Sequence, residues 1–337
     1  MDLEARYDFE LERVSNWITS NRYSKVLIQS APGLLPYLPK IAKELANSTK
    51  SEVLIDGRGR YGACDIPHSL VGAEAVVHFG HTGFVPAGYP ILYVPAICKL
   101  EIDDYIPRVI ELLIGKNKVG LCASVQHIHT LSGLKRELES KGKKVMIGPP
   151  GKRAQFPGQV VGCDYLCAMR LDSEVDSHLI VAGGEFHSIG LALSVSKPVI
   201  HLNPYSGDAK WVEKSVADKI NRIRGYAGYL LMSSKKVAVV EGLISGQRTP
   251  GVAKSVRELL NRKLPGATVD IIQAENFSDD FFLGLKELGY DIAVTAACTR
   301  FVTDDYDRSP LPIFEAREVH RFFYDALNMS RGVFILQ

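Results

Sequence analysis

Three of the six cysteines stand in short turn sequences that are rich in glycine and alanine. Each follows an apolar run typical of a buried strand, and the loops beyond the carboxyl ends of parallel strands are where open α/β sheets bind ligands. The sequence holds no Cys-x-x-Cys pair, so a metal site would need ligands from distant parts of the chain. A shared metal site is therefore one prediction, and three separate packing residues are the alternative. These cysteines are Cys64, Cys163 and Cys298.

The other three cysteines fit packing roles better. Cys98 and Cys122 lie inside apolar runs, where a cysteine usually behaves as a small hydrophobic residue. Cys167 lies one helical turn beyond Cys163, so we expect it to be a neighbour of the site rather than a ligand. The pair resembles the start of a Cys-x3-Cys-x2-Cys loop, but the third position is Arg170, which excludes that motif.

Five further residues, all in loops after expected strands, are candidates for binding a small cofactor. Gln126 stands where a helix is expected to begin, and the N–H groups of a helix start favour an anion such as a carboxylate. Gly183 and Gly184 would allow a ligand to approach the backbone closely. Gln247 and Arg248 precede another expected helix and offer a guanidinium group there. Ordinary turns and caps explain each of these stretches equally well.

Two other motifs give weaker signals. His78 and His81 end an expected strand and could bind a metal, or could lie in a solvated loop. Residues 57–62 fit Gly-x-Gly-x-x-Gly, but residues 77–81 hold no acidic residue of the kind that binds a dinucleotide ribose. We interpret this stretch as a flexible loop that presents Cys64. The sequence also holds neither a Gly-x-x-x-x-Gly-Lys-Ser/Thr loop nor a Gly-x-Ser-x-Gly elbow.

Buried strands and helices alternate along the chain in three similar series. Such alternation predicts parallel sheets with helices on both faces, and right-handed crossovers bring the loops after the strands to one edge. The expected strands cover 25–29, 52–56, 75–79 and 91–95, then 118–122, 144–148, 178–182 and 198–202, then 236–241, 268–272, 291–295 and 333–336. A long helix is expected at 314–327, before the last strand.

This repetition indicates an α/β protein of three tandem similar domains. We expect each domain to be a small four-stranded parallel sheet flanked by helices, and the three domains to pack around a central site. The predicted boundaries are residues 1–107, 108–205 and 206–337, so each domain carries one of Cys64, Cys163 and Cys298.

The composition is that of an ordinary globular protein, with 46% hydrophobic and 23% charged residues. A formal net charge of +2 does not indicate a large nucleic-acid footprint. The acidic and polar start of the chain does not fit a secretory signal, and the longest apolar region, residues 179–200, includes Glu185, His187 and Lys197. We therefore expect a cytoplasmic protein with no membrane span and no direct nucleic-acid partner.

The cysteine motifs resemble those of a known family. They look like the three cysteine motifs of the archaeal diphthamide-synthesis enzymes, the 2-(3-amino-3-carboxypropyl)histidine synthase family. The resemblance covers essentially the full chain, including residues 29–35 and 78–81. The motifs read Tyr61-Gly62-Ala63-Cys64-Asp65, Gly162-Cys163 and Ala297-Cys298-Thr299-Arg300.

The resemblance implies a [4Fe-4S] cluster held by Cys64, Cys163 and Cys298, since thiolates are the soft ligands that iron–sulfur clusters require. Three protein ligands leave one iron open to the methionine part of S-adenosylmethionine. In the family, an electron from the reduced cluster cleaves the bond between the sulfur and methionine Cγ, a choice that positioning would determine. The 3-amino-3-carboxypropyl group then joins carbon 2 of the imidazole of one histidine in elongation factor 2.

The resemblance also implies partners. These are elongation factor 2 as the protein substrate, an external electron donor, and a second copy of the chain in a homodimer. It implies no catalytic residue beyond the cluster ligands.

Two other function classes stay open from the residues alone. A zinc-stabilised binding module without catalysis would also use cysteine ligands, and tightly bound zinc without iron or sulfide would favour it. A small-molecule receptor like the periplasmic binding proteins would suit repeated α/β units, and ligand-induced closure that does not depend on the cysteines would favour it.

Overall fold

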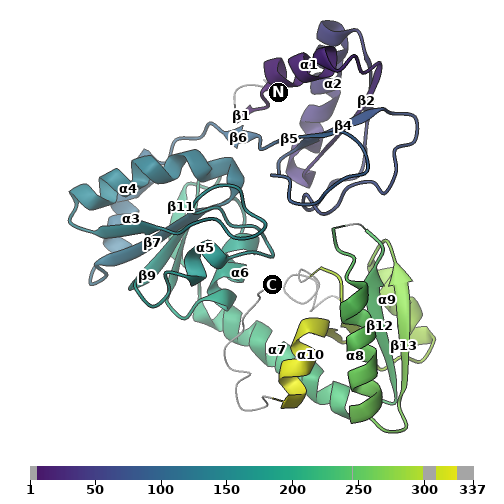
Figure 1. Ribbon diagram of the computed structural model, residues 1–337. Coiled ribbons are helices and arrows are strands. Elements are labelled where there is room, and N and C mark those ends of the chain that lie inside the picture. The colour runs from purple at the N-terminus through teal and green to yellow at the C-terminus, as the bar shows by residue number, and fades with distance from the viewer. Residues whose placement is uncertain (1–5, 245, 299–308, 325–337) are drawn as a thin grey trace. The chain divides into compact units, whose positions relative to one another are not determined.

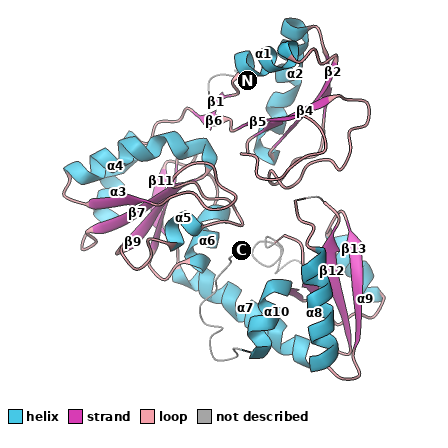
Figure 2. Cartoon of the chain, viewed as in Figure 1, coloured by secondary structure: helices cyan, strands magenta, loops and turns pink. Residues whose placement is uncertain are grey.

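The computed structural model of the protein describes residues 6–244, 246–298 and 309–324. The chain divides into two compact units, each described by itself below. Unit 1 consists of Met1–Ser188 and Lys197–Trp211, and unit 2 consists of Ile189–Ser196 and Val212–Gln337. Figure 1 follows the chain by residue number, and Figure 2 shows that helices and strands alternate through both units, as the sequence pattern predicts.

The first sheet of unit 1 has four parallel strands in the order β3-β2-β4-β5. All four lie where the sequence predicts strands. Helices α1 (Leu11–Ser20) and α2 (Leu38–Thr49) share a core with this sheet, and a 3-10 helix, η1 (Pro32–Tyr37), leads into α2. The strands are β2 (Lys25–Ser30), β3 (Glu52–Ile55), β4 (Ala75–Phe79) and β5 (Ile91–Val94).

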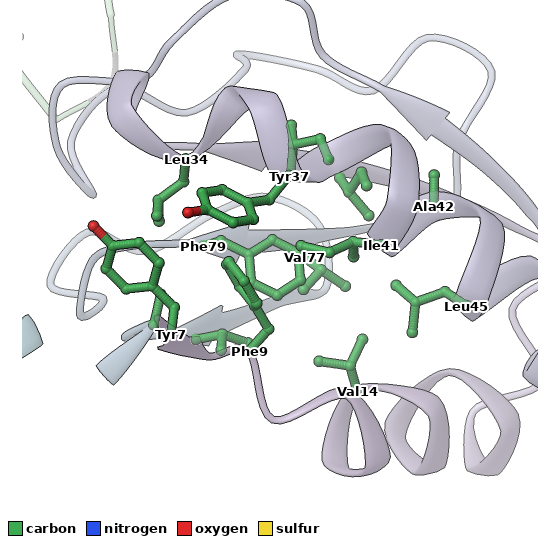
Figure 3. Close-up of a cluster of buried hydrophobic side chains, with 14 of the residues drawn as sticks. Tyr7, Phe9, Val14, Leu34, Tyr37, Ile41, Ala42, Leu45, Val77 and Phe79 are labelled. Atoms are coloured by element: carbon green, nitrogen blue, oxygen red, sulfur yellow. The ribbon is translucent and has the colours of Figure 1, made fainter. Parts of the chain in front are cut away.

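A hydrophobic core lies between this sheet and its helices (Figure 3). Helix α2 buries residues at helical spacing, including Ile41 and Leu45, because one face of an amphipathic helix turns toward the sheet. Strand residues Val77 and Phe79 meet that face, and both are fully buried. Burying one such side chain contributes about 1.5–3 kcal/mol, so this core fixes the strand ends that carry the loops above them.

The second sheet of unit 1 has five strands, in the order β11-β10-β9-β7-β8. Four of them are parallel and match the predicted strands. The fifth, β11, pairs antiparallel with β10 through a tight turn at Gly207, where φ is +67°. The sequence pattern missed this edge strand because Asp208-Ala209-Lys210-Trp211 alternates polar and apolar residues and lacks the continuous apolar run of the other strands. The strands are β7 (Lys118–Ala123), β8 (Lys144–Ile147), β9 (Ser177–Val181), β10 (Val199–Asn203) and β11 (Asp208–Trp211).

Short helices and a small ribbon complete unit 1. Strand β1 (Tyr7–Asp8) pairs antiparallel with β6 (Ile97–Cys98). The remaining helices are η2 (Asp103–Tyr105), α3 (Ile106–Leu112), η3 (Val125–Thr130), α4 (Leu131–Ser140) and α5 (Leu166–Met169). Helix α6 (Phe186–Ser194) begins in unit 1 and continues into the segment Ile189–Ser196 of unit 2.

Unit 2 contains a third parallel sheet, in the order β13-β12-β14-β15. Buried side chains on its two faces form separate cores, so helices cover both sides of the sheet. Its strands are β12 (Lys236–Gly242), β13 (Thr268–Ala274), β14 (Ile292–Thr295) and β15 (Ile313–Glu315). Its helices are α7 (Lys214–Ser233), α8 (Pro250–Lys263), α9 (Asp279–Glu287) and α10 (Ala316–Tyr324).

One element of this sheet differs from the prediction. The expected helix at 314–327 begins only at Ala316, because Ile313–Glu315 pairs with β14 as a parallel strand. Phe314 is buried in the sheet core, so tertiary pairing overrides the local helical pattern. The expected strand at 333–336 lies outside the described residues. Helix α7 is not among the predicted elements.

The three sheets share one strand order. In each, the second strand of the series lies at one edge, followed by the first, the third and the fourth. The predicted fold of three similar units, each built on four parallel strands with flanking helices, is therefore confirmed, with β11 as an addition. The predicted boundaries at 107/108 and 205/206 stay predictions. No helix in the described ranges combines the length and apolar character needed to cross a bilayer.

Candidate metal centre

Cys64 lies in the long loop between β3 and β4, at the carboxyl edge of the first sheet. Cys64 is part of a turn, in which the N–H of Asp65 donates to the carbonyl of Gly62 over 2.9 Å. A Cβ at Gly62 would lie 3.2 Å from the Cys64 sulfur, so glycine leaves room around the thiol. The Tyr93 hydroxyl donates to the Ala63 carbonyl at 3.4 Å. The loop therefore presents a half-exposed sulfur from a braced turn.

A cluster of charged residues holds the Cys64 loop in place. Asp65 is buried, and its Oδ1 accepts from Arg58 Nη2 at 2.6 Å and from Arg60 Nη1 at 3.1 Å. Arg60 Nε also donates to Asp56 Oδ2 at 2.8 Å, and its backbone N–H donates to the Ser30 carbonyl at 2.8 Å. The loop that the sequence indicated as flexible is thus tied to the ends of β2 and β3.

Cys163 lies in the loop that follows β8 in the second sheet, just before α5. Asp164 is buried and fixes this loop, because its carboxylate accepts from the backbone N–H of Arg153 at 2.7 Å and of Leu166 at 3.1 Å. Arg153 Nη1 donates to the Cys163 sulfur at 3.3 Å. A Cβ at Gly162 would lie 2.4 Å from the Phe186 ring, so only glycine fits beside the cysteine.

Cys298 follows β14 at the carboxyl edge of the third sheet, in unit 2. The backbone before it is fixed, since the Ala296 N–H donates to the Val240 carbonyl at 2.8 Å and the Ala297 N–H donates to Thr295 Oγ1 at 3.3 Å. The Thr249 hydroxyl, at the start of α8, donates to the Ala296 carbonyl. Cys298 is half-exposed. The rest of its motif, Thr299-Arg300, lies outside the described residues.

The remaining cysteines have a different environment. Cys98, Cys122 and Cys167 are all buried, as expected for packing residues. Burial raises the pKa of Cys167 to about 12 and that of Cys122 well above its ordinary value. Cys167 also donates to the Gln159 carbonyl at 3.3 Å. A thiol held in this way stays protonated, whereas a metal ligand must be a thiolate.

The chemistry of the half-exposed cysteines therefore fits a metal cluster better than that of the buried ones. Each half-exposed sulfur stands on a fixed loop at the carboxyl edge of its own sheet, where ligands bind in this class of fold. Within the part of the chain that the structure describes, no three His, Cys, Asp or Glu side chains are grouped as ligands of a metal ion. Two of these cysteines belong to unit 1 and Cys298 to unit 2, so the shared site stays a prediction.

A buried row of polar side chains lies beside the Cys64 loop. Gln29 Nε2 is 2.6 Å from His78 Nδ1, and His78 Nε2 is 2.8 Å from His81 Nδ1. The His78 ring also packs against Tyr93, with ring centroids 5.2 Å apart. Burial lowers the pKa of His81 to about 4 and that of His78 well below its ordinary value, so both are neutral at pH 7. Both nitrogens of His78 are engaged and the residue is fully buried, so it fits neither a metal ligand nor a solvated imidazole, the two interpretations that the sequence left open.

Gln126, a predicted cofactor-binding residue, joins the two sheets of unit 1. Its Nε2 donates to the carbonyl of Gly80 at 2.6 Å and to that of Pro95 at 3.2 Å. This amide nitrogen therefore has a structural role at the carboxyl edges of the strands, where the prediction placed it.

The two predicted glycines follow β9 and differ in their surroundings. A Cβ at Gly183 would lie 2.4 Å from the Tyr205 ring, so packing already requires glycine there. Gly184 has a φ of +69°, and a Cβ there would meet nothing within 4 Å. Gly184 is thus the position where a ligand could approach the backbone.

Gln247 and Arg248 lie in the turn between β12 and α8. The Gln247 N–H donates to the Ile244 carbonyl at 2.9 Å, and the Arg248 side chain is exposed. This turn and the Cys298 loop both emerge at the carboxyl edge of the third sheet, as the sequence predicts.

The residues that sequence reasoning missed are Arg153 and Tyr93, which contact the two cysteine loops of unit 1. Tyr93 gave no signal, because it lies inside an ordinary strand. Arg153 gave a partial one, because a basic pair, Lys152-Arg153, interrupts a Gly/Pro-rich loop directly after a strand.

Comparison with known proteins gives consistent matches. The family model described as "Putative diphthamide synthesis protein" matches residues 31–325. The 2-(3-amino-3-carboxypropyl)histidine synthase of Pyrococcus horikoshii is 31% identical over 303 residues, which cover 88% of this chain and 84% of that relative. Subunit 1 of the human 2-(3-amino-3-carboxypropyl)histidine synthase is 25% identical over 327 residues, covering 94% of this chain and 72% of the human one.

A solved structure agrees with these matches. The crystal structure of Dph2 from Pyrococcus horikoshii with a 4Fe-4S cluster superposes with a TM-score of 0.85 and 27% sequence identity, covering 98% of this chain and 94% of the other. Sequence and fold therefore agree over nearly the whole length. The chain belongs to the family of diphthamide synthesis proteins.

Proposed function

We propose that this protein transfers a 3-amino-3-carboxypropyl group from S-adenosylmethionine to a histidine of elongation factor 2, the first step of diphthamide biosynthesis. The observation that carries the proposal is the match to the Pyrococcus horikoshii synthase over most of both chains. The loop geometry supports it, since one half-exposed cysteine stands at the carboxyl edge of each sheet.

In this proposal Cys64, Cys163 and Cys298 are the protein ligands of a [4Fe-4S] cluster. When bound, such a cluster supplies one electron for cleaving the Cγ–S bond of S-adenosylmethionine, and an external donor restores that electron. The chain's own part is to hold the sulfur atoms. Asp65 ties the first loop to two arginines, and Asp164 anchors the second through two backbone N–H groups. Fixed loops of this kind reduce the reorganisation needed for binding.

The proposed contacts to S-adenosylmethionine lie on the same sheet edges. Gly184 offers open space beside its backbone, and the exposed Arg248 offers a guanidinium that would pair with the methionine carboxylate. Gln126, Gly183 and Gln247 complete the proposed set. Gln126 and Gly183 also serve the packing of unit 1, so their effect on binding would come through the shape of the site.

The proposed partners follow from this reaction. Elongation factor 2 presents the acceptor histidine, an external reductant supplies electrons, and two copies of the chain form a homodimer in the cytoplasm. A folded protein substrate requires that its histidine reach the cysteine loops, and the partial exposure of the three cysteine residues supports this.

A direct test follows the transferred carbon atoms. Anaerobically purified protein is mixed with a reductant, elongation factor 2 and S-adenosylmethionine labelled in the aminocarboxypropyl carbons. We expect label on one histidine and an equal amount of methylthioadenosine. Elongation factor 2 with that histidine replaced by glutamine serves as the control and should take up no label. Labelled S-adenosylmethionine recovered intact, under conditions where the protein contains iron and sulfide, would contradict the proposal.

A further inference from the structure

Arg153 lies against the Cys163 sulfur in a fixed arrangement. Its Nη1 donates to the sulfur at 3.3 Å. Its backbone is fixed as well, because the Arg153 N–H donates to the Asp164 carboxylate at 2.7 Å. A Cβ at Gly151 would lie 2.0 Å from the same carboxylate, so the loop backbone packs directly against Asp164 and only glycine fits at this position. Asp164, the residue after Cys163, therefore fixes the backbone position from which the Arg153 side chain extends.

The guanidinium also packs on an aromatic ring that follows the third strand of the first sheet. The Arg153 Cζ lies 5.3 Å from the centroid of the Phe84 ring, a cation–π contact. The segment carrying Phe84 is itself held, since Gln155 Nε2 donates to the Gly83 carbonyl at 2.9 Å and Gln159 Nε2 to the Thr82 hydroxyl at 2.7 Å. The guanidinium is thus held between a sulfur and a ring.

No carboxylate pairs with this guanidinium in the described ranges of the chain. The ion pairs of unit 1 involve other arginines and lysines, such as Arg58 and Arg60 beside Asp65. Asp164, the acidic neighbour, accepts backbone N–H groups instead. The Arg153 guanidinium therefore donates to the sulfur rather than to a carboxylate.

We propose that Arg153 is a positioning residue that sets the reduction potential of the cluster held by Cys163. The proposal rests on the proposed function, in which Cys163 is a cluster ligand. Reduction adds one negative charge to the cluster. An N–H···S bond and a nearby positive charge stabilise that charge, so both raise the potential. Arg153 supplies both from a fixed position.

The test is a potentiometric titration of the anaerobically purified protein, followed by paramagnetic resonance. In Arg153→Gln the equilibrium constant for one-electron reduction should fall about tenfold, which corresponds to a potential about 59 mV more negative. Arg153→Lys keeps the charge without the planar fork, so its shift should be smaller. Phe84→Leu loosens the guanidinium and should shift the potential in the same direction. Lys152→Ala, at the exposed neighbouring position, should leave it unchanged.

Iron and sulfide contents are measured in every sample, because they separate the two claims. A cluster present in full amount with an unchanged potential in Arg153→Gln would overturn this inference and leave the proposed function intact. If Arg153→Gln does not retain its cluster, the reduction potentials of Arg153→Lys and Phe84→Leu are compared with that of the wild type instead. An unchanged potential in both would then overturn this inference. Wild-type protein without iron would contradict the proposed function, and this inference with it.

Discussion

Gln159 Nε2 donates to the Thr82 hydroxyl over 2.7 Å, and both side chains are buried in unit 1. The bond joins the loop after β4 in the first sheet to the segment before Cys163 in the second. Gln159 Oε1 also accepts from the N–H groups of Gln155 and Phe156, at 2.8 and 3.1 Å. One amide therefore links the two sheets and shapes the loop that carries Arg153.

This link predicts a loss of stability in Gln159→Leu. The variant leaves the Thr82 hydroxyl and two backbone N–H groups without their partner. Leaving the buried Thr82 hydroxyl unpaired costs about 1–3 kcal/mol, and the two N–H groups, which belong to exposed residues, cost less, so the urea midpoint should fall clearly. Thr82→Val, which removes one partner of a single bond, should have a smaller effect. Unfolding followed by circular dichroism measures both, and equal midpoints for Gln159→Leu and wild type would contradict the assigned role.

The charged residues beside Cys64 predict unequal effects for two arginines on the same aspartate. Arg60 is buried, so Arg60→Met leaves Asp56 and Asp65 poorly compensated and should cost about 3–5 kcal/mol. The Arg58 side chain is 44% exposed, so Arg58→Met should cost only about 0–1 kcal/mol. The two variants are matched controls in one urea experiment. Similar losses of unfolding free energy in both variants would show that burial does not determine how much each arginine contributes to stability.

Buried histidines predict that acid destabilises the fold. His127 is fully buried, and neither ring nitrogen has a hydrogen-bond partner among the described residues. Burial lowers its pKa from 6.5 to about 4, so between those values the unfolded chain binds a proton that the folded chain does not. Stability from this group is complete above pH 6.5 and is lost as the pH falls toward 4.

His127→Leu removes this dependence. Relative to wild type, the variant should gain about 2 kcal/mol when the pH is lowered from 7.5 to 5. The measurement is the free energy of unfolding of both proteins at the two pH values. If the two proteins differ in unfolding free energy by the same amount at both pH values, the lowered pKa of His127 is contradicted.

The sequence allowed much of the fold to be predicted, for a physical reason. Parallel strands that are buried on both faces have nearly continuous apolar sequences, so segments such as 26–28 and 237–240 can be recognised as strands from the sequence alone. The first two residues of the helix expected at 314–327, Phe314 and Glu315, were predicted wrongly, because they form a strand only through pairing with β14, a contact that local propensity does not carry. Helix α7 was missed for the related reason that its apolar face is broken by polar residues.

The candidate site divides in the same way. Glycine-flanked cysteines at strand ends can be identified from the sequence, since the loops after parallel strands lie on one edge. The contacts that fix the cysteine loops cannot be identified from the sequence. Arg153 lies 10 positions before Cys163 and packs on Phe84, and Tyr93 lies 30 positions beyond Ala63. Only the folded chain brings these side chains together, because each of them is separated from its partners in the sequence.

The central claim is that Cys64, Cys163 and Cys298 together hold one iron–sulfur cluster, and its most direct test is the iron and acid-labile sulfide content of single alanine variants purified anaerobically. Wild type, Cys98→Ala and Cys122→Ala should contain about four irons and four sulfides per chain, as a [4Fe-4S] cluster requires. Cys64→Ala, Cys163→Ala and Cys298→Ala should each lose most of both. Full iron and sulfide in any of these three, or a wild-type protein with tightly bound zinc and no iron, would contradict the claim.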